Sequence, residues 1–247
     1  MGDPPEPETV VPVQEAGATG SAVAAATVVV LRGGAHALEV LLLQRHPDLS
    51  FAGGAWVFPG GRVDPSDFGA DPDDLEDAER TAAVRECAEE AGLRLDAASL
   101  HRWSHWTPPP RQSKRFSTAF FVAGGGADAE VVTIDEEEIV AHRWCEPDEA
   151  LSAQASGELV LTPPTFITLC QLAAHRSVDD LLAAAPSRRV EHFSTRIGIE
   201  GETVCALYHG DVAYESMDLS LDGPRHRLTM APGPWRYERD ASTTAEG

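Results

Sequence analysis

The segment RECAEEAG, residues Arg85–Gly92, places three glutamates, Glu86, Glu89 and Glu90, within five consecutive positions. On a helix, residues three and four apart lie on the same side, so we expect these carboxylates to converge. Like charges at this spacing repel by roughly 0.2–0.5 kcal/mol per pair, a cost that bound cations would remove. Ligands made only of oxygen favour Mg²⁺ or Mn²⁺ over zinc. The alternative is a charged face in solvent, with Arg85 paired to Glu89 one turn later.

The helix that carries this segment is predicted to span Leu75–Ala91. Its sequence is rich in Ala, Glu, Arg and Leu and contains neither Pro nor Gly, a composition with high helix propensity. Asp73 or Asp74 is suited to cap its first turn, and Gly92 is suited to end it. The glutamates therefore belong to the last turns of a long, well-delimited helix.

Apolar and β-branched runs predict strands on both sides of this helix. The expected strands are Ala25–Leu31, Leu38–Gln44, Ala55–Phe58, Leu100–Trp106, Arg115–Ala123 and Val140–Cys145, the first two as a hairpin. Further helices are expected at Pro147–Ala155, Pro164–His175 and Val178–Ala185. In the tail, the segments ETVCALY, HRLTM and WRYER also read as strands. After Phe58, the sequence Pro59-Gly60-Gly61 predicts a sharp turn of the backbone.

With its flanks, the glutamate segment resembles the box of the Nudix hydrolase superfamily, G-x5-E-x7-R-E-U-x-E-E-x-G-U, in which U is an apolar residue. The second half matches in register, at Arg85, Glu86, Cys87, Glu89, Glu90, Gly92 and Leu93. Eight positions before the arginine the family carries Glu, and this chain has Asp77, with Glu76 beside it. The family's strand-to-PGG entry is present as FPGG, residues 58–61.

The spacing departs from the family. From box glycine to box arginine the family has 14 steps, whereas Gly61 to Arg85 is 85 − 61 = 24, so ten residues are inserted. The acidic stretch RVDPSDFGADPDD, residues 62–74, accounts for them, and we expect a solvated loop without a catalytic role. An interrupted box is similar to that of the branch represented by the mammalian peroxisomal coenzyme A diphosphatase. Other segments shared with that branch include LLLQR (41–45), RFSTAFFVA (115–123), EIVAHRW (138–144) and LTPPTF (161–166).

The resemblance implies a Nudix fold, an α/β/α sandwich with a mixed sheet, and hydrolysis of a diphosphate that links a nucleoside to a second group. Coenzyme A or acyl-coenzyme A is the expected substrate, and NADH or ADP-ribose is the alternative. Mg²⁺ or Mn²⁺ would be held by Glu86, Glu89, Glu90 and Gly61, so that a bound water becomes more acidic. A non-catalytic Nudix-fold sensor or binding protein is disfavoured, because the box glutamates are intact.

The remaining candidate residues assist that chemistry. Arg85 is expected to orient a carboxylate through a bidentate pair. The general base is expected to be Glu86 or, from a later loop, Glu138, which is also a candidate metal ligand. For substrate phosphates, Arg45, Lys114 and Arg115 are the candidates, each weighed against an ordinary surface ion pair. Lys114 is the only lysine of the chain.

The resemblance implies a small, nucleotide-derived molecule as the partner, and composition disfavours larger anionic partners. The 247 residues include 40 acidic and 19 basic side chains, a net charge of −21, which disfavours nucleic acids and anionic membranes. The four cysteines form no CxxC pair and no secretory signal is recognised, so we expect a cytoplasmic protein with reduced thiols.

Three parts are expected along the chain. Residues 1–20 form a mobile arm, 21–185 the Nudix hydrolase domain, and 186–247 a small extension, containing β-strands, packed on that domain. The extension is expected either to cover the active site or to mediate a homodimer.

Overall fold

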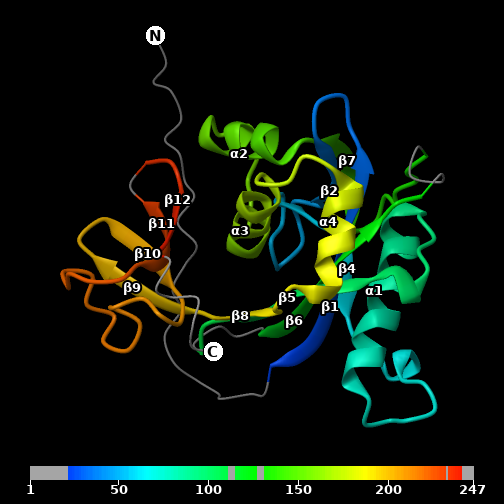
Figure 1. Ribbon diagram of the computed structural model, residues 1–247, viewed down its shortest axis with the longest axis horizontal. Coiled ribbons are helices and arrows are strands. Elements are labelled where there is room, and N and C mark those ends of the chain that lie inside the picture. Colours follow the sequence, from blue (N-terminus) through cyan, green and yellow to red (C-terminus); the bar gives the residue numbers. More distant parts are fainter. Residues whose placement is uncertain (1–21, 111–114, 127–130, 232, 241–247) are drawn as a thin grey trace.

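The computed structural model describes residues 22–110, 115–126, 131–231 and 233–240, and it is built around a mixed eight-stranded sheet (Figure 1). The strands are β1 (Val23–Gly33), β2 (Leu38–Arg45), β3 (Trp56–Val57), β4 (Gly60–Arg62), β5 (His101–Thr107), β6 (Phe116–Gly124), β7 (Ile139–Cys145) and β8 (Glu191–Ser194). Their order is β3-β2-β1-β6-β5-β8, with β4 also paired to β1 and β7 to β2. The β1–β6 and β5–β8 pairs are parallel and the others antiparallel.

Helices cover both faces of this sheet, because its central strands are apolar on both sides. In β1, Val28 and Val30 pack with helix α1 (Leu75–Ala91), whereas Val29 and Leu31 pack into the opposite core. That second core contains α2 (Pro147–Ala155), α3 (Pro163–Leu172) and α4 (Val178–Ala184). Figure 1 shows α1 on one side of the sheet and α2 and α3 on the other. The predicted α/β/α sandwich is confirmed.

Helix α1 has the predicted bounds. The Asp74 carboxylate accepts a hydrogen bond from the backbone N–H of Asp77 at 3.0 Å, and Gly92 ends the helix with φ of 69°. Its sheet-facing residues are small, namely Ala78, Ala82, Ala83, Cys87 and Ala91. Small side chains let a helix approach its neighbour closely, so the glutamates of the last turns lie against the sheet edge.

The turn predicted at Gly60-Gly61 continues as a strand. Gly60, Gly61 and Arg62 form β4, which pairs with Thr27, Ala26 and Ala25 of β1. A Cβ atom at Gly60 would lie 2.4 Å from the carbonyl oxygen of Ala26, which explains why glycine is needed in so close a pairing. Three short 3-10 turns complete this part of the chain, η1 (Pro65–Asp67), η2 (Ala97–Ser99) and η4 (Ala185–Ser187).

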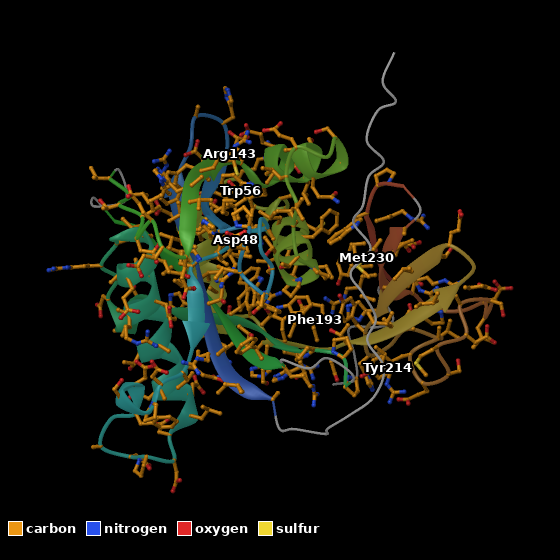
Figure 2. The ribbon with its side chains drawn as sticks, turned by 180° about the vertical axis from the view of Figure 1, so that it is seen from behind. Asp48, Trp56, Arg143, Phe193, Tyr214 and Met230 are labelled. Carbon is orange, nitrogen blue, oxygen red and sulfur yellow. The ribbon has the colours of Figure 1, made fainter. Side chains whose placement is uncertain are left out.

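The segment after residue 186, called the extension below, adds β8 to the main sheet and forms a second, antiparallel sheet. Its strands are β9 (Arg196–Glu200), β10 (Thr203–Leu207), β11 (His226–Ala231) and β12 (Arg236–Arg239), in the order β12-β11-β10-β9. Strands β10, β11 and β12 match the predicted segments, while β8 and β9 were not predicted. Phe193 of β8 stacks on Trp106 of β5, with ring centroids 3.9 Å apart (Figure 2).

The extension and the main sheet therefore share one hydrophobic core, in which Tyr208 and Leu228 pack with residues of α3. Trp235 also meets Phe166 of α3 edge-on at 5.4 Å. The predicted mobile arm, residues 1–20, lies outside the described residues. None of the helices in the described ranges is both long enough and apolar enough to cross a membrane.

Candidate active site

The last turns of α1 meet the glycines of β4. The backbone N–H of Gly60 donates to Glu90 Oε2 at 2.9 Å. A Cβ atom at Gly61 would lie 2.3 Å from Glu86 Oε1, so a side chain at this position would displace that carboxylate. Only 16% of the Glu86 side chain and 6% of the Glu90 side chain are exposed. The alternative of a charged face in solvent therefore does not hold for these two residues.

Arg85 is the link between the helix and the loop that follows β4. Its Nε and Nη2 donate to the two carboxylate oxygens of Asp67, both at 2.9 Å, which is the predicted bidentate geometry. Its Nη1 donates to Glu86 Oε1 and Glu89 Oε2, also at 2.9 Å each. One guanidinium thus orients two of the box glutamates. The i,i+4 pair with Glu89 is present, and the Glu89 side chain is 59% exposed.

Asp67 was not predicted as a site residue, and its burial contradicts the prediction that the whole acidic stretch is a solvated loop. It lies in η1, within the stretch predicted to be a solvated loop, yet it is only 3% exposed. The hydrogen bond from Arg85 lowers the pKa of Asp67 despite its burial. The buried Asp67 supports the site, and the stretch is exposed without interruption from Gly69 to its end at Asp74.

A signal for Asp67 was present in the sequence. Counted forward from Gly61, the acidic position of G-x5-E falls on Asp67. Counting backward from Arg85 leads instead to Asp77, which is exposed in the first turn of α1. The inserted residues therefore follow Asp67, and they leave the Gly61-to-Asp67 spacing of the box intact.

Arg45 and Glu138 close the site from the other side. Arg45 Nη1 lies 3.8 Å from Glu90 Oε1, and its Nη2 lies 3.4 Å from Glu138 Oε2. The backbone N–H of His46 donates to the carbonyl of Glu138 at 2.7 Å, which joins the end of β2 to the start of β7. The structure thus brings Glu138 to the box glutamates, and it places Arg45 between two carboxylates. The buried Nε–H of Arg45 has no hydrogen-bond acceptor among the described residues.

The electrostatics of this cluster are dominated by uncompensated negative charge. Burial, assisted by the charges of Glu86 and Glu138, raises the pKa of Glu90 to about 8, while the Gly60 N–H and Arg45 oppose the shift. Burial also raises the pKa of Glu86, against the effect of Arg85. A cation between these carboxylates would offset both the burial and the repulsion.

The donor chemistry fits a hard divalent cation, since Glu86, Glu89 and Glu90 offer only oxygen atoms. Within the described ranges, however, no group of three or more His, Cys, Asp or Glu side chains is placed so that it could hold a metal ion. Glu86 and Glu90 face the glycines of β4, whereas Glu89 turns toward Arg85. Binding a cation with all three would therefore require a change of side-chain rotamer.

The other two residues predicted to contact the substrate phosphates, Arg115 and Lys114, are less closely tied to the carboxylate site than Arg45. Arg115 precedes β6, and its Nη2 donates to the carbonyl of Pro108 at 3.5 Å. Lys114 lies outside the described residues.

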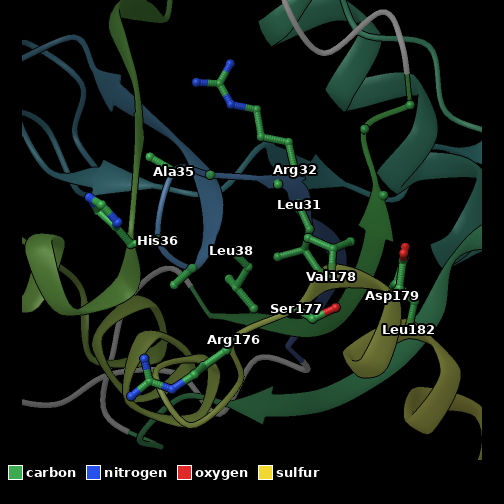
Figure 3. A pocket seen from close by; sticks show the side chains of 16 residues that line it. Leu31, Arg32, Ala35, His36, Leu38, Arg176, Ser177, Val178, Asp179 and Leu182 are labelled. Carbon is green, nitrogen blue, oxygen red and sulfur yellow. The ribbon is translucent and has the colours of Figure 1, made fainter.

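A separate hollow of about 530 Å³ lies at the other end of β1 (Figure 3). It is lined by the β1–β2 turn, by Gly124–Gly126 and by the start of α4. Gly61 pairs with Ala26, whereas this hollow begins at Leu31 and continues into the turn. It therefore does not belong to the carboxylate site.

Comparison with known proteins identifies a family, relatives and solved structures that this chain resembles. Residues 22–163 match the model of the NUDIX domain. The chain is 26% identical to the acyl-coenzyme A diphosphatase NUDT19 of Homo sapiens, over 73% of each chain. It is 31% identical to the Gallus gallus protein of the same name, over 46% of this chain but only 31% of that protein. Among solved structures, a NUDIX hydrolase from Alicyclobacillus acidocaldarius is 28% identical, with a TM-score of 0.59 over 67% of this chain and 97% of that one.

Proposed function

The chain belongs to the NUDIX family and is a Nudix hydrolase, and on that premise we propose that it cleaves the diphosphate of coenzyme A or acyl-coenzyme A with the aid of Mg²⁺ or Mn²⁺. The observation that carries the metal dependence is the pair of buried carboxylates, Glu86 and Glu90, held against the glycines of β4. The substrate is supported by the Homo sapiens and Gallus gallus relatives, which are named acyl-coenzyme A diphosphatases.

We assign Glu86, Glu89, Glu90 and the backbone of Gly61 as the groups that hold the cation. A bound divalent ion would neutralise charge on the diphosphate and make a water molecule more acidic. Arg85 would serve the reaction by orienting Glu86 and Glu89, and Asp67 by holding Arg85, so neither needs to touch the substrate.

Glu86 is the proposed general base, and Glu138 is the alternative. Glu86 is favoured because it is buried beside the other carboxylates, which makes it a better proton acceptor near neutral pH. Glu138 lies across Arg45 at the entrance and is 57% exposed. Arg45, Lys114 and Arg115 are proposed to meet the substrate phosphates, Arg45 by exchanging its loose contacts with carboxylates for a phosphate oxygen.

A substrate panel tests the proposal. Coenzyme A, an acyl-coenzyme A, NADH and ADP-ribose would be incubated with Mg²⁺ or Mn²⁺ and the products identified by mass spectrometry. We expect 3′,5′-ADP and 4′-phosphopantetheine, or its acyl form. A kcat/KM for NADH or ADP-ribose more than about tenfold above that for coenzyme A, or about 1.4 kcal/mol in transition-state binding, would overturn the substrate assignment.

A further inference from the structure

The loop between β2 and β3 presents an aromatic side chain to solvent near the carboxylate site. Phe51 is 46% exposed, and its ring meets that of Phe116 edge-on, with centroids 5.4 Å apart. Val23, beside Phe116 in the sheet, is also 46% exposed. Phe51, Phe116 and Val23 together form a small apolar surface that a flat ligand could cover.

This loop is built to hold Phe51 in place. Ala52, the next residue, has a φ of 51°, a left-handed conformation that costs a non-glycine residue about 1 kcal/mol or more. Gly53 packs so tightly that a Cβ atom would lie 2.4 Å from the carbonyl oxygen of Pro47. Hydrogen bonds between Arg45 and both Gly54 and Ala55, of 3.1 and 3.0 Å, close the loop at its base.

The loop leaves the sheet at Arg45, which lies beside one of the box glutamates, Glu90. Arg45, at its base, reaches Glu90 and Glu138, and Figure 2 marks the loop by Asp48 and its return to the sheet by Trp56. Phe116 pairs with Val23 of β1, three residues before Ala26, the partner of Gly61. Strand spacing and rise then separate the α-carbons of Phe116 and Gly61 by roughly 14 Å. An extended nucleoside diphosphate can bridge that span.

We propose that Phe51, supported by Phe116, stacks the heteroaromatic base of the substrate nucleotide while its phosphates meet the box glutamates. This assignment rests on the proposed function and names the specificity-determining residue of that site. A base suits a half-exposed ring because its polar edges stay in water while its face is covered. An acyl chain would need an apolar groove on several sides. Stacking of a base on an aromatic side chain contributes about 1–3 kcal/mol.

Binding measurements on the full chain test this without relying on turnover. Calorimetric titration with ADP and with pyrophosphate, each with Mg²⁺, would compare the wild type with Phe51→Ala, Phe51→Leu and Phe51→Trp. We expect Phe51→Ala and Phe51→Leu to weaken ADP binding by about tenfold or more and to leave pyrophosphate binding within about twofold. Phe51→Trp should retain ADP affinity. Val23→Ala, a control at an equally exposed aliphatic neighbour, should change neither.

The outcomes separate this inference from the proposed function. Unchanged ADP binding in Phe51→Ala, equal losses for ADP and pyrophosphate in a variant that melts like the wild type, or no ADP binding by the wild type would each overturn the role of Phe51. A wild type that binds ADP through Phe51 but cleaves no member of the substrate panel would overturn the proposed function and leave the stacking site standing.

Discussion

Two buried carboxylates in this protein have opposite surroundings. Glu90 of α1 is 5% exposed and Asp211 of the extension is 6% exposed. Asp211 accepts hydrogen bonds from Nε and Nη2 of Arg227 and from the backbone N–H groups of His226 and Ala213. Glu90 accepts one hydrogen bond, from the N–H of Gly60, and has an arginine only at 3.8 Å.

The difference in partners reverses the effect of burial. Burial raises the pKa of both groups, but Arg227 and the two backbone donors outweigh it at Asp211, so the pKa of Asp211 is lowered. At Glu90 burial prevails, and its pKa rises to about 8. A buried carboxylate with complete partners stabilises structure, whereas one with incomplete partners marks a place where a ligand supplies the missing charge.

The largest effect on activity is expected when the buried carboxylate of Glu90 is replaced. Glu90→Gln should lower metal-dependent turnover by about 10³-fold, or about 4 kcal/mol, because it removes a charged oxygen ligand. Without metal the variant should melt at the same or a higher temperature, since a buried charge is removed. Steady-state kinetics and thermal unfolding would measure both. Glu76→Gln, on the exposed first turn of the same helix, is the control. Near-wild-type turnover of Glu90→Gln at saturating Mg²⁺ would show that Glu90 holds no metal.

Asp211→Asn should show the converse behaviour. It leaves the buried guanidinium of Arg227 without its counter-charge, which costs about 3 kcal/mol or more of the free energy of unfolding. Denaturant unfolding would measure this loss, with Glu215→Gln, in the exposed pair with Arg196, as control. Because Asp211 lies in the extension, we expect the folded variant to retain its kcat. A loss below about 1 kcal/mol would mean that the ion pair is not a major contributor to stability.

Asp67→Asn should lower activity less than Glu90→Gln but more than Asp211→Asn. It weakens the fork that positions Arg85, and through it Glu86 and Glu89, without touching the proposed substrate. Changes to such supporting partners typically cost about 10–100-fold in activity or metal affinity. Turnover measured against Mg²⁺ concentration would test this, with Asp77→Asn, in the exposed first turn of α1, as the matched control. Equal effects of the two substitutions would mean that Asp67 has no special role.

The pH dependence of the unfolding free energy tests whether the ionised form of Asp211 stabilises the fold. Because its folded pKa is below the unfolded value of 3.8, its contribution to stability is complete above that value and is lost as the pH falls through the folded pKa. The difference in unfolding free energy between wild type and Asp211→Asn should therefore be constant above about pH 5 and narrow as the pH falls from there toward about 2. A difference that stays constant over this range would contradict the assignment.

The smallest effect is expected from the exposed part of the insertion. Removing several residues between Gly69 and Asp73 leaves Asp67 and the cap residue Asp74 in place. The unfolding free energy should change by no more than about 1 kcal/mol, since loop length contributes weakly. Metal-dependent hydrolysis should persist, measured on the same substrate panel. Complete loss of activity in a folded variant would show that this loop shapes the substrate site.

Sequence alone determined the elements whose signals are local. The bounds of α1 and its cap at Gly92 were predictable, because helix propensity and capping are read from neighbouring residues. The α/β/α layers were expected from the resemblance to the Nudix family. Three strands of the extension were predicted from the alternating pattern of their sequences.

Tertiary structure decided which of the acidic residues matter and how. Glu89 and Glu90 are adjacent in sequence, but only Glu90 turns into the sheet edge, where burial raises its pKa. Asp67 and Asp77 both fit the acidic position of the Nudix box when counted from one end or the other, yet Asp67 is buried in η1 against Arg85 and Asp77 is exposed in the first turn of α1. Strand β8 forms because β5 offers it an edge and Trp106 a stacking surface. Burial, pairing and the pKa values that follow depend on contacts between distant segments, and no local pattern encodes those contacts.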